Sequence, residues 1–441
     1  MTSGDNQGDI ADFTRAIAIN PQDANAYYNR GNAKFELGDK QGAIADYSQA
    51  IAINPQYAPA YNNRGAIKFD LGDNQGATAD YNQAIAINPH YDAAYNNRAL
   101  ARFELGDNQG AIFDFTQAIG INPHDAAAYY NRGNVYFNLG DNQEAIYDYN
   151  QAIAINPQYD AAYANRGNVK SDLGDYQGAI ADYDQAIAIN PQDPEAYYNR
   201  GLAKSDLGDK QGEIADFNQA IAINPHYAAA YYNRGIAKSD LGDKQGAIDD
   251  YNQAIAINPQ YGAAFSNRGY AKFELGDNQG AILDLTHAIT IDSQDADAFN
   301  NRGLAKFELG DKHGAIDDHS QAIAINSQYS FAYFNRGIAK SDLGDKQGAI
   351  DDYNEAIAIN PKDIDFYINR GLAKFVLGDK QGAIDDHSQA IAIDPHCADA
   401  YLNRAATWQS LANTTQMCAD LAVASRLGDS AAQEYFARMC Q

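Results

Sequence analysis

Small and aromatic residues recur along the chain at helical spacing, in stretches of about one helix length. In Ala26–Asp39, the residues Tyr27, Arg30, Gly31 and Lys34 fall at i, i+3, i+4 and i+7. This is the spacing of one face of an α-helix. We therefore predict a helix in this stretch.

A second stretch of the same kind, Lys40–Pro55, follows directly. Here Ala43, Tyr47, Ala50 and Ile51 repeat the helical spacing. The two stretches therefore predict a pair of helices that pack through these faces.

The residues between the two stretches are typical of a tight connection. Gly38 suits a left-handed helix end, Asp39 caps the second helix, and Pro55 stops it. Gly42 stands where Glu would complete a capping box, as Glu144 does in one copy, and such a glycine costs roughly 0.5–1 kcal/mol of helix stability. The pattern predicts a helix hairpin.

Small residues on the two faces let the helices approach closely, and larger residues fill the remaining space. The small residues are Gly31, Ala43 and Ala50, and the larger residues are Tyr27, Leu37, Tyr47 and Ile51.

The hairpin pattern recurs with a strict period of 34 residues. Aligned on the Asn-Arg dipeptide, arginines stand at positions 30, 64, 98, 132, 166, 200, 234, 268, 302, 336, 370 and 404. A period this regular is typical of identical units stacked in one array.

The repeating unit resembles the tetratricopeptide repeat family over essentially the whole chain. The residues that carry the resemblance are Tyr27, Gly31, Ala43, Tyr47, Ala50 and Pro55. The resemblance implies an all-α fold, a right-handed superhelical solenoid of helix-turn-helix repeats. Such a fold is poorly specific for function.

Four segments follow from the alignment. Residues 1–23 form a half repeat with the second helix only, 24–397 form eleven full repeats, 398–427 form a degenerate twelfth repeat, and 428–441 form a C-terminal capping helix. The bare first helix indicates either a fragment of a longer protein or an N-terminal cap.

Two charged columns are invariant among the copies within this chain. We call the set of equivalent positions in the aligned copies a column. The column of Arg30 is Arg in all twelve copies, and the column of Asp46 is Asp in all thirteen, from Asp12 to Asp420. We predict a charge-assisted pair between the two helices. Whether the Asp belongs to the same repeat or to a neighbour stays open at this stage.

An asparagine precedes the arginine in all twelve copies and points off the packed face. The resemblance implies that this side lines a concave groove. A carboxamide both donates and accepts, so a row of them suits the main chain of an extended peptide. The alternative is that each Asn bonds a neighbouring helix or its own backbone.

Aromatic columns flank the asparagines on the same side and vary between repeats. The predicted peptide-binding groove comprises Asn29, Asn63, Asn97, Asn131, Asn165, Asn199, Asn233, Asn267, Asn301, Asn335, Asn369, Tyr28, Tyr130, Tyr198, Tyr232, Phe35, Phe69 and Phe103. Acidic residues such as Glu36, Asp70 and Glu274 lie beyond them and either attract basic side chains or form a solvated face.

The net charge narrows the partner class. Lys and Arg total 32 against 58 Asp and Glu, a formal charge of -26. This charge excludes nucleic acid and anionic membrane as partners and favours a neutral or basic protein segment. The start of the chain has no signal-peptide pattern and no stretch approaches 18 apolar residues, so we expect a soluble, cytoplasmic protein.

Candidate catalytic and metal-binding residues do not converge. Cys397, Cys418 and Cys440 match no zinc-ligand spacing, and we expect reduced structural thiols. The histidines occupy loops or packing columns, and no phosphate loop or nucleophile motif is present. The sequence therefore predicts a non-enzyme with no cofactor and no metal.

The function predicted from the sequence is a protein-protein interaction scaffold. It would bind an extended segment of an unknown partner in an asparagine-lined groove. The alternatives are a structural spacer, a rod that self-associates through the N-terminal half repeat, or the regulatory part of a larger enzyme.

Overall fold

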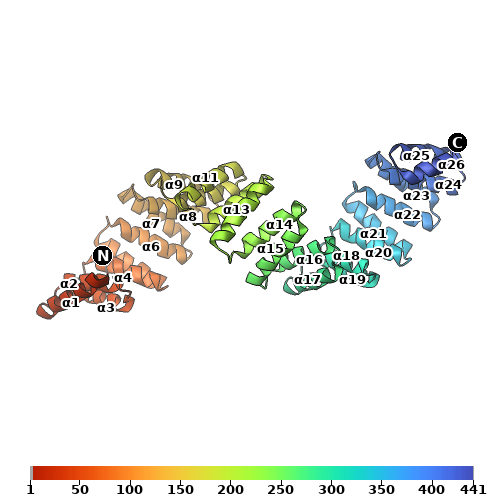
Figure 1. The fold of residues 1–441 in the computed structure, drawn as a ribbon. Coiled ribbons are helices and arrows are strands. Elements are labelled where there is room, and N and C mark those ends of the chain that lie inside the picture. The colour runs from red at the N-terminus through yellow and green to blue at the C-terminus, as the bar shows by residue number, and fades with distance from the viewer. Residues whose placement is uncertain (1–2, 441) are drawn as a thin grey trace. The chain divides into compact units, whose positions relative to one another are not determined.

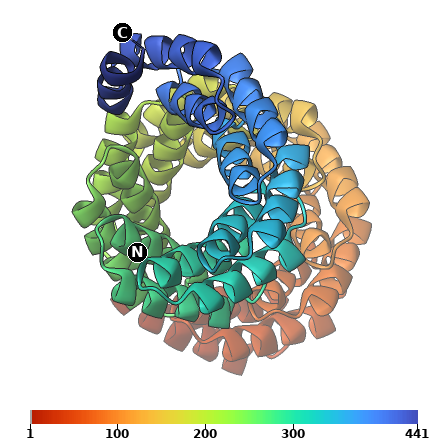
Figure 2. The ribbon, with the colours of Figure 1, turned by 90° about the vertical axis from the view of Figure 1, so that its right-hand side faces the viewer.

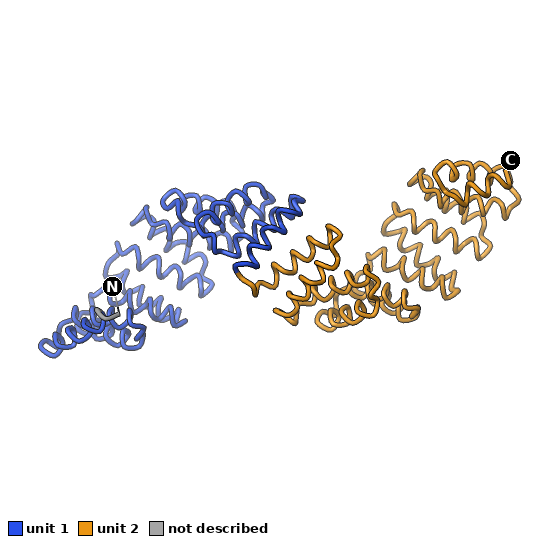
Figure 3. The backbone as a smooth tube through the Cα atoms, viewed as in Figure 1, with its two compact units in different colours: residues 1–223 blue, residues 224–441 orange. Residues whose placement is uncertain are grey.

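The computed structural model describes residues 3–440 and divides into two compact units, Met1–Ile223 and Asn224–Gln441 (Figure 3). Each unit consists of helices alone among the described residues, and consecutive helices lie side by side within it (Figures 1 and 2). The predicted all-α solenoid of stacked helix-turn-helix repeats is therefore confirmed within each unit.

The first unit contains thirteen of the helices in the described chain. They are α1 (Ser3–Ile19), α2 (Ala24–Glu36), α3 (Lys40–Ile53), α4 (Ala58–Asp70), α5 (Asn74–Ile87), α6 (Asp92–Glu104), α7 (Asn108–Ile121), α8 (Ala126–Asn138), α9 (Asn142–Ile155), α10 (Asp160–Asp172), α11 (Tyr176–Ile189), α12 (Pro194–Asp206) and α13 (Lys210–Ile223).

The second unit contains the other thirteen helices of residues 3–440. They are α14 (Ala228–Asp240), α15 (Lys244–Ile257), α16 (Gly262–Glu274), α17 (Asn278–Ile291), α18 (Ala296–Glu308), α19 (Lys312–Ile325), α20 (Ser330–Asp342), α21 (Lys346–Ile359), α22 (Ile364–Val376), α23 (Lys380–Ile393), α24 (Ala398–Ser410), α25 (Thr414–Arg426) and α26 (Ser430–Met439).

The turn between the two helices of a repeat forms as the sequence predicts. Gly38 adopts φ 84°, in the left-handed region, and the Gly42 amide donates a 2.8 Å hydrogen bond to Asp39 Oδ1. A Cβ atom at Gly42 would lie 2.0 Å from Asp39 Oδ2, so the glycine makes room for the capping carboxylate.

The expectation that Glu improves this cap is wrong. In the repeat that carries Glu144 in place of glycine, the Asp141 side chain makes no capping hydrogen bond. The larger residue at this position occupies the space that the capping carboxylate takes in the other repeats.

The core of each repeat lies between its two helices. Ala43, Tyr47 and Ala50 are buried, and a Cβ at Gly31 would lie 2.7 Å from Tyr47 Cε1. Leu37 was predicted to fill this core, but its side chain is 37% exposed. The prediction is wrong because Leu37 lies past the last turn of α2, at its C-cap, where it is partly open to solvent.

Each invariant arginine bonds the invariant aspartate of its own repeat, 16 residues later. Arg30 Nε and Nη2 donate to Asp46 Oδ2 and Oδ1 at 2.8 and 2.7 Å. The Nη2–Oδ1 distance is 2.5–2.7 Å in all twelve repeats. The prediction of an interhelix pair is confirmed, and the open choice between repeats is resolved in favour of the same repeat.

A lysine four residues after the arginine completes the ion pair. Lys34 Nζ lies 2.8 Å from Asp46 Oδ2. Burial alone would raise the pKa of Asp46, but hydrogen bonds from Arg30 and Lys34 outweigh it and lower the pKa. In the fourth repeat, Tyr136 replaces the lysine. Burial raises the pKa of Asp148 there, because Arg132 is the one cation among the described residues that favours the charged carboxylate.

The same arginine also links its repeat to the one before. Arg64 Nη1 donates to Ser48 Oγ at 3.0 Å, and Arg200 Nη1 lies 2.6 Å from Asp184 Oδ1. Its guanidinium lies 5.2–5.7 Å from the centroid of the aromatic ring three residues earlier. One side chain therefore contacts three helices.

The cysteines differ from the sequence expectation of three reduced thiols. Cys418 and Cys440 form a disulfide with a Cα–Cα distance of 5.6 Å, while Cys397 is a free, half-buried thiol. The expectation is wrong because α26 packs against α25 and brings together two residues that are 22 positions apart.

Removal of Arg132 should destabilise the fourth repeat. Arg132→Ala leaves the Asp148 side chain, which is 0% exposed, without either cation that a repeat normally supplies. Breaking one partner of such a buried pair costs about 3–5 kcal/mol. Amide hydrogen exchange of α8 and α9 measures the local free energy of opening.

Arg15→Ala is the matched control, since Arg15 pairs with Asp12 on the surface at 3.2 Å. We expect its effect to stay within about 0.5 kcal/mol. Equal effects of the two changes would contradict a structural role for the buried pair.

Two histidines in the buried aromatic column should make the fold sensitive to acid. Burial lowers the pKa of His387 to about 4 from the ordinary value of 6.5. The folded state holds this ring neutral while the unfolded chain protonates it, so stability falls as pH drops from 6.5 towards 4. The slope is up to about 1.4 kcal/mol per pH unit.

His387→Tyr restores the residue found at the equivalent Tyr353, which is also buried. We expect this variant to lose less stability than the parent between pH 6.5 and 4.5 in urea melts. Parallel loss in both proteins would show that His387 is not the source.

Candidate functional site

The asparagine column lies on the first helix of every repeat, one position before the ion-paired arginine. Because the arginine points between the helices, its neighbour emerges on the other side of the packed face. The column therefore faces away from the second helices, and its asparagines are half-buried.

Several of these asparagines bond the preceding repeat. Asn165 Nδ2 donates to Tyr130 Oη at 3.0 Å and to Asn134 Oδ1 at 2.9 Å. Equivalent hydrogen bonds of 3.0–3.2 Å are made by Asn63, Asn97, Asn199, Asn267 and Asn335. These contacts join the first helices of successive repeats.

The bonded asparagines use their nitrogen. In Asn97, Asn165, Asn199, Asn267 and Asn335, the carboxamide oxygen accepts no hydrogen bond from the described residues. Each oxygen remains an acceptor for a ligand amide.

Three other members of the column make no side-chain hydrogen bond within the described residues, and two donate to their own helix. Asn29, Asn131 and Asn301 make no side-chain hydrogen bond with the described part of the chain. Asn233 and Asn369 donate to the backbone carbonyls of Ala229 and Asp365 in their own helices. The column therefore combines structural members with members whose polar atoms face outward.

The predicted groove tyrosines are packed between repeats. Tyr28 lies 5.7 Å from Tyr47 and 5.0 Å from Tyr57, measured between ring centroids. Tyr130 and Tyr232 make the same two contacts in their repeats, and Tyr198 lies 5.7 Å from Phe217. These rings are half-buried, so they do not present an open face to a ligand.

The predicted phenylalanines differ among themselves. Phe35 is the most open and lines a cavity of about 380 Å³ together with Asn32, Tyr47 and Asn63. Phe69 and Phe103 are half-buried against the cores formed around Tyr81 and Phe115. Phe35 is therefore the phenylalanine best placed to contact a ligand.

Cavities follow the asparagine column in both units. Those in the first unit contain Asn29, Asn63 or Asn199 and measure about 600, 380 and 320 Å³. In the second unit, a cavity of about 630 Å³ is lined by Asn267, Asn301 and Asn335, and one of about 380 Å³ by Asn403. Each of these five cavities contains at least one member of the column.

The acidic column one turn further along the first helices is partly paired. Glu274 Oε2 lies 2.7 Å from Lys244 Nζ, and Asp70 and Asp342 form ion pairs with Lys40 and Lys312. The hydrogen bond from Lys312 lowers the pKa of Asp342. These carboxylates therefore also link neighbouring repeats.

Sequence reasoning missed the acceptors that serve the asparagine column. Asn32, Asn134 and Asn168 lie three residues after it and accept hydrogen bonds both from the next asparagine and from the buried tyrosine, as Asn134 does from Tyr149 at 2.8 Å. Their helical spacing from the column is the signal that could have identified them.

Residues 3–440 contain no group of three His, Cys, Asp or Glu side chains placed to hold a metal ion. No helix in the described chain is long and apolar enough to cross a membrane. His319 is buried, its Nδ1 lies 3.1 Å from Asn300 Oδ1, and burial lowers its pKa to about 4.

Comparison with known families gives matches along most of the chain. A family described as "TPR repeat" matches residues 3–38, 31–72, 65–106, 99–140, 167–208 and 269–310. The "Tetratricopeptide repeat" family matches residues 126–159, 228–261 and 330–363, and a further tetratricopeptide repeat family matches residues 194–227. A search of curated protein sequences found no match.

Several solved structures are similar to this chain. MamA is 29% identical over 36% of this chain and 94% of its own, with a TM-score of 0.35. Cut9-Hcn1 of the APC/C is 14% identical over 98% of both chains, with a TM-score of 0.48. YrrB, described as a TPR protein with an unusual peptide-binding site, is 22% identical over 42% of this chain and 95% of its own, with a TM-score of 0.38.

The two kinds of asparagine should respond differently to removal. Asn165→Ala deletes two hydrogen bonds to the preceding repeat, each worth about 0.5–1.5 kcal/mol, and Ala regains part of this as the better helix former. We expect a net loss of about 1 kcal/mol in the opening free energy of α10, measured by amide hydrogen exchange.

Asn301→Ala is the comparison, because it removes a side chain with no hydrogen bond in the described chain. We expect the opening free energy of α18 to stay the same or to rise by a few tenths of a kcal/mol. Equal losses at both positions would show that the whole column is structural.

Proposed function

This chain belongs to the tetratricopeptide repeat family, and we propose that it is an interaction scaffold that binds an extended segment of a partner protein along its asparagine column. Membership of this repeat family supports a role in protein interaction. The path of the segment and the chemistry of its recognition are inferred from the side chains.

One observation carries the proposal. The cavities of about 320–630 Å³ described above each contain a member of the asparagine column. Concave surfaces of this size accept side chains of a ligand. Cavities that recur beside one column suit a linear ligand that passes from repeat to repeat.

The carboxamide oxygens supply main-chain recognition. An oxygen such as that of Asn165, whose nitrogen is engaged with Tyr130 and Asn134, is held in place and accepts a hydrogen bond from a peptide N–H. Because this contact reads the backbone, the side chains of the ligand are selected by the cavities between the asparagines.

The net charge of the chain determines which charge is favoured in the bound segment. A formal charge of -26 attracts neutral or basic segments and repels acidic ones. The ion pairs of Asp70 and Glu274 with lysines reduce the acidic field locally, but the excess of 58 acidic over 32 basic residues remains.

Selection from a random displayed peptide library tests this proposal. We expect the enriched peptides to carry net positive charge and to bind more weakly as salt rises. Their affinity should fall for Asn131→Ala/Asn301→Ala, which removes one unbonded asparagine from each unit so that a peptide on either unit loses a contact. A lost hydrogen bond of about 0.5–1.5 kcal/mol weakens binding roughly 2- to 10-fold.

Gln109→Ala/Gln279→Ala is the matched control, since it removes two amides from exposed positions on the second helices α7 and α17. Calorimetric titration should give it the affinity of the parent protein. Enrichment of acidic peptides, or an equal loss in the two double variants, would overturn the proposal.

A further inference from the structure

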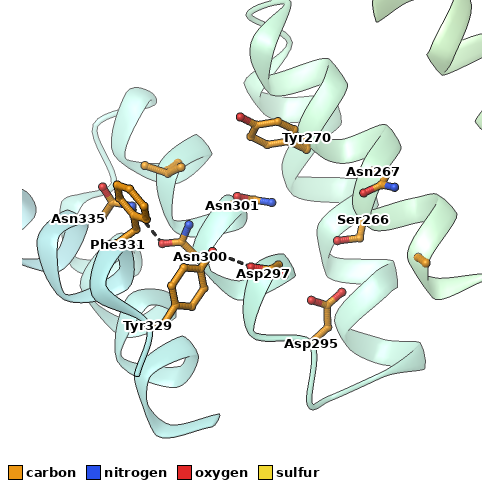
Figure 4. Close-up of a pocket in the computed structure, with 12 residues that line it drawn as sticks. Ser266, Asn267, Tyr270, Asp295, Asp297, Asn300, Asn301, Tyr329, Phe331 and Asn335 are labelled. Atoms are coloured by element: carbon orange, nitrogen blue, oxygen red, sulfur yellow. Dashed lines mark hydrogen bonds between the residues drawn. The ribbon is translucent and has the colours of Figure 1, made fainter. Parts of the chain in front are cut away.

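The largest of the five cavities, about 630 Å³, lies within the second unit (Figure 4). It is formed by one side of α16, α18 and α20 and by the turns before α18 and α20. The residues that line it are Ala263, Ser266, Asn267, Tyr270, Asp295, Asp297, Asn300, Asn301, Leu304, Tyr329, Phe331 and Asn335.

The cavity lies where an aromatic pair of the preceding repeat is absent. In the preceding repeat, Tyr232 packs against Tyr261 of the next repeat, with 4.8 Å between ring centroids and an angle of 37° between the rings. One repeat later the same two columns contain Ser266 and Asp295. A serine and a carboxylate replace two phenol rings and leave the space open.

Ser266 supplies a hydroxyl that is open to the cavity. The residue is 8% exposed, and its hydroxyl makes no hydrogen bond with the described residues. Figure 4 shows it pointing into the cavity, with the unbonded carboxamide of Asn301 on the opposite helix. A hydroxyl that faces a cavity and makes no hydrogen bond to the protein is available to a polar group of a ligand.

Two carboxylates give the cavity its charge. Asp295 Oδ1 caps α18 through the Ala298 amide at 2.9 Å, which leaves Oδ2 for the cavity. Asp297 Oδ1 accepts a 2.6 Å hydrogen bond from the Tyr329 hydroxyl. Burial, followed by the hydrogen bond to Asp297 and the charges of both carboxylates, raises the pKa of Tyr329.

No cation neutralises these carboxylates from within the cavity lining. None of the residues that line it is a lysine or an arginine. The arginines of the three repeats, Arg268, Arg302 and Arg336, are bound to Asp284, Asp318 and Asp352 between the helices. A positively charged group of a ligand would therefore meet no competing cation from the residues that line the cavity.

Aromatic rings stand at the edge of the cavity. Tyr270 and Phe331 are among the exposed large residues, and Phe331 is 50% exposed. A planar guanidinium stacks on such rings while its N–H groups bond carboxylate and carboxamide oxygens. A lysine ammonium offers one compact charge and gains less from the same surroundings.

We propose that this cavity receives an arginine side chain of the partner segment, with Asp295 and Asp297 as counter-charges and Ser266 and Asn301 as hydrogen-bond partners. The inference rests on the proposed function, because it assigns a side-chain specificity to one position of the same column. It predicts an arginine where the bound segment passes α18.

Ligand-observed nuclear magnetic resonance on the full chain tests the assignment with N-acetyl-arginine methylamide as the probe. The citrulline analogue has the same shape without the charge, and the lysine analogue has the charge without the planar group. At about 0.15 M salt, where long-range attraction is screened, we expect the arginine probe to bind at least fivefold more tightly than either analogue.

Two variants locate the binding. Asp295→Asn/Asp297→Asn keeps the helix cap and the acceptor for Tyr329 but removes both charges, and Ser266→Tyr restores the large residue found at Tyr232. Each should weaken binding of the arginine probe at least fivefold. Asp193→Asn/Glu195→Gln, at the equivalent columns of the first unit, is the matched control with the same loss of charge, and it should bind as the parent does.

Equal binding of the arginine and citrulline probes would overturn the assignment, as would binding that the two cavity variants leave unchanged. A lysine probe that binds as tightly as arginine would overturn the guanidinium specificity. If library-selected peptides still bind the parent array under any of these results, the cavity assignment fails while the proposed scaffold function stands.

Discussion

A bidentate ion pair between two helices is the interaction on which the rest of this structure depends. Arg30 joins the first helix to the second through Asp46, and its remaining nitrogen reaches back to Thr14 in the helix before. The same geometry recurs every 34 residues, so the two helices of each hairpin are joined by nearly identical contacts. Lys34 neutralises the second oxygen, which makes the buried carboxylate tolerable.

This arrangement separates stability from recognition. The arginine, the aromatic residue three positions earlier and the aspartate lie between the two helices of a repeat. The residue just before the arginine therefore takes no part in this ion pair. The asparagine column is then available to link repeats, as Asn165 does, or to face outward, as Asn301 does. Cavity shape is varied by the residue before it, which is Tyr232 in one repeat and Ser266 in the next.

The sequence allowed the fold and the ion pair to be predicted, because a strict period and invariant opposite charges have few structural solutions. It did not show which repeat supplies the aspartate, since both placements satisfy the same spacing. The sequence also did not show that some asparagines link repeats while others face outward. Their partners, such as Tyr130, were interpreted as ligand contacts. From the sequence, Gly42 was expected to lower helix stability. The position of the Asp39 carboxylate shows that a larger residue there would displace the capping side chain. The cavity beside Ser266 was not predicted either. It lies where Ser266 and Asp295 replace an aromatic pair of the preceding repeat, and no single sequence motif indicates such a replacement.

The claim that a linear segment follows the asparagine column is tested most directly by a photo-cross-linking scan with one selected peptide as ligand. A benzophenone amino acid replaces, one position at a time, Leu100, Leu202 and Leu304 on the first helices and Gln109, Gln211 and Gln279 on the second helices. The account predicts cross-links from first-helix positions alone, and cross-linked peptide residues that advance in order from repeat to repeat. Cross-links from the second-helix positions, or cross-linked residues without linear order, would contradict it.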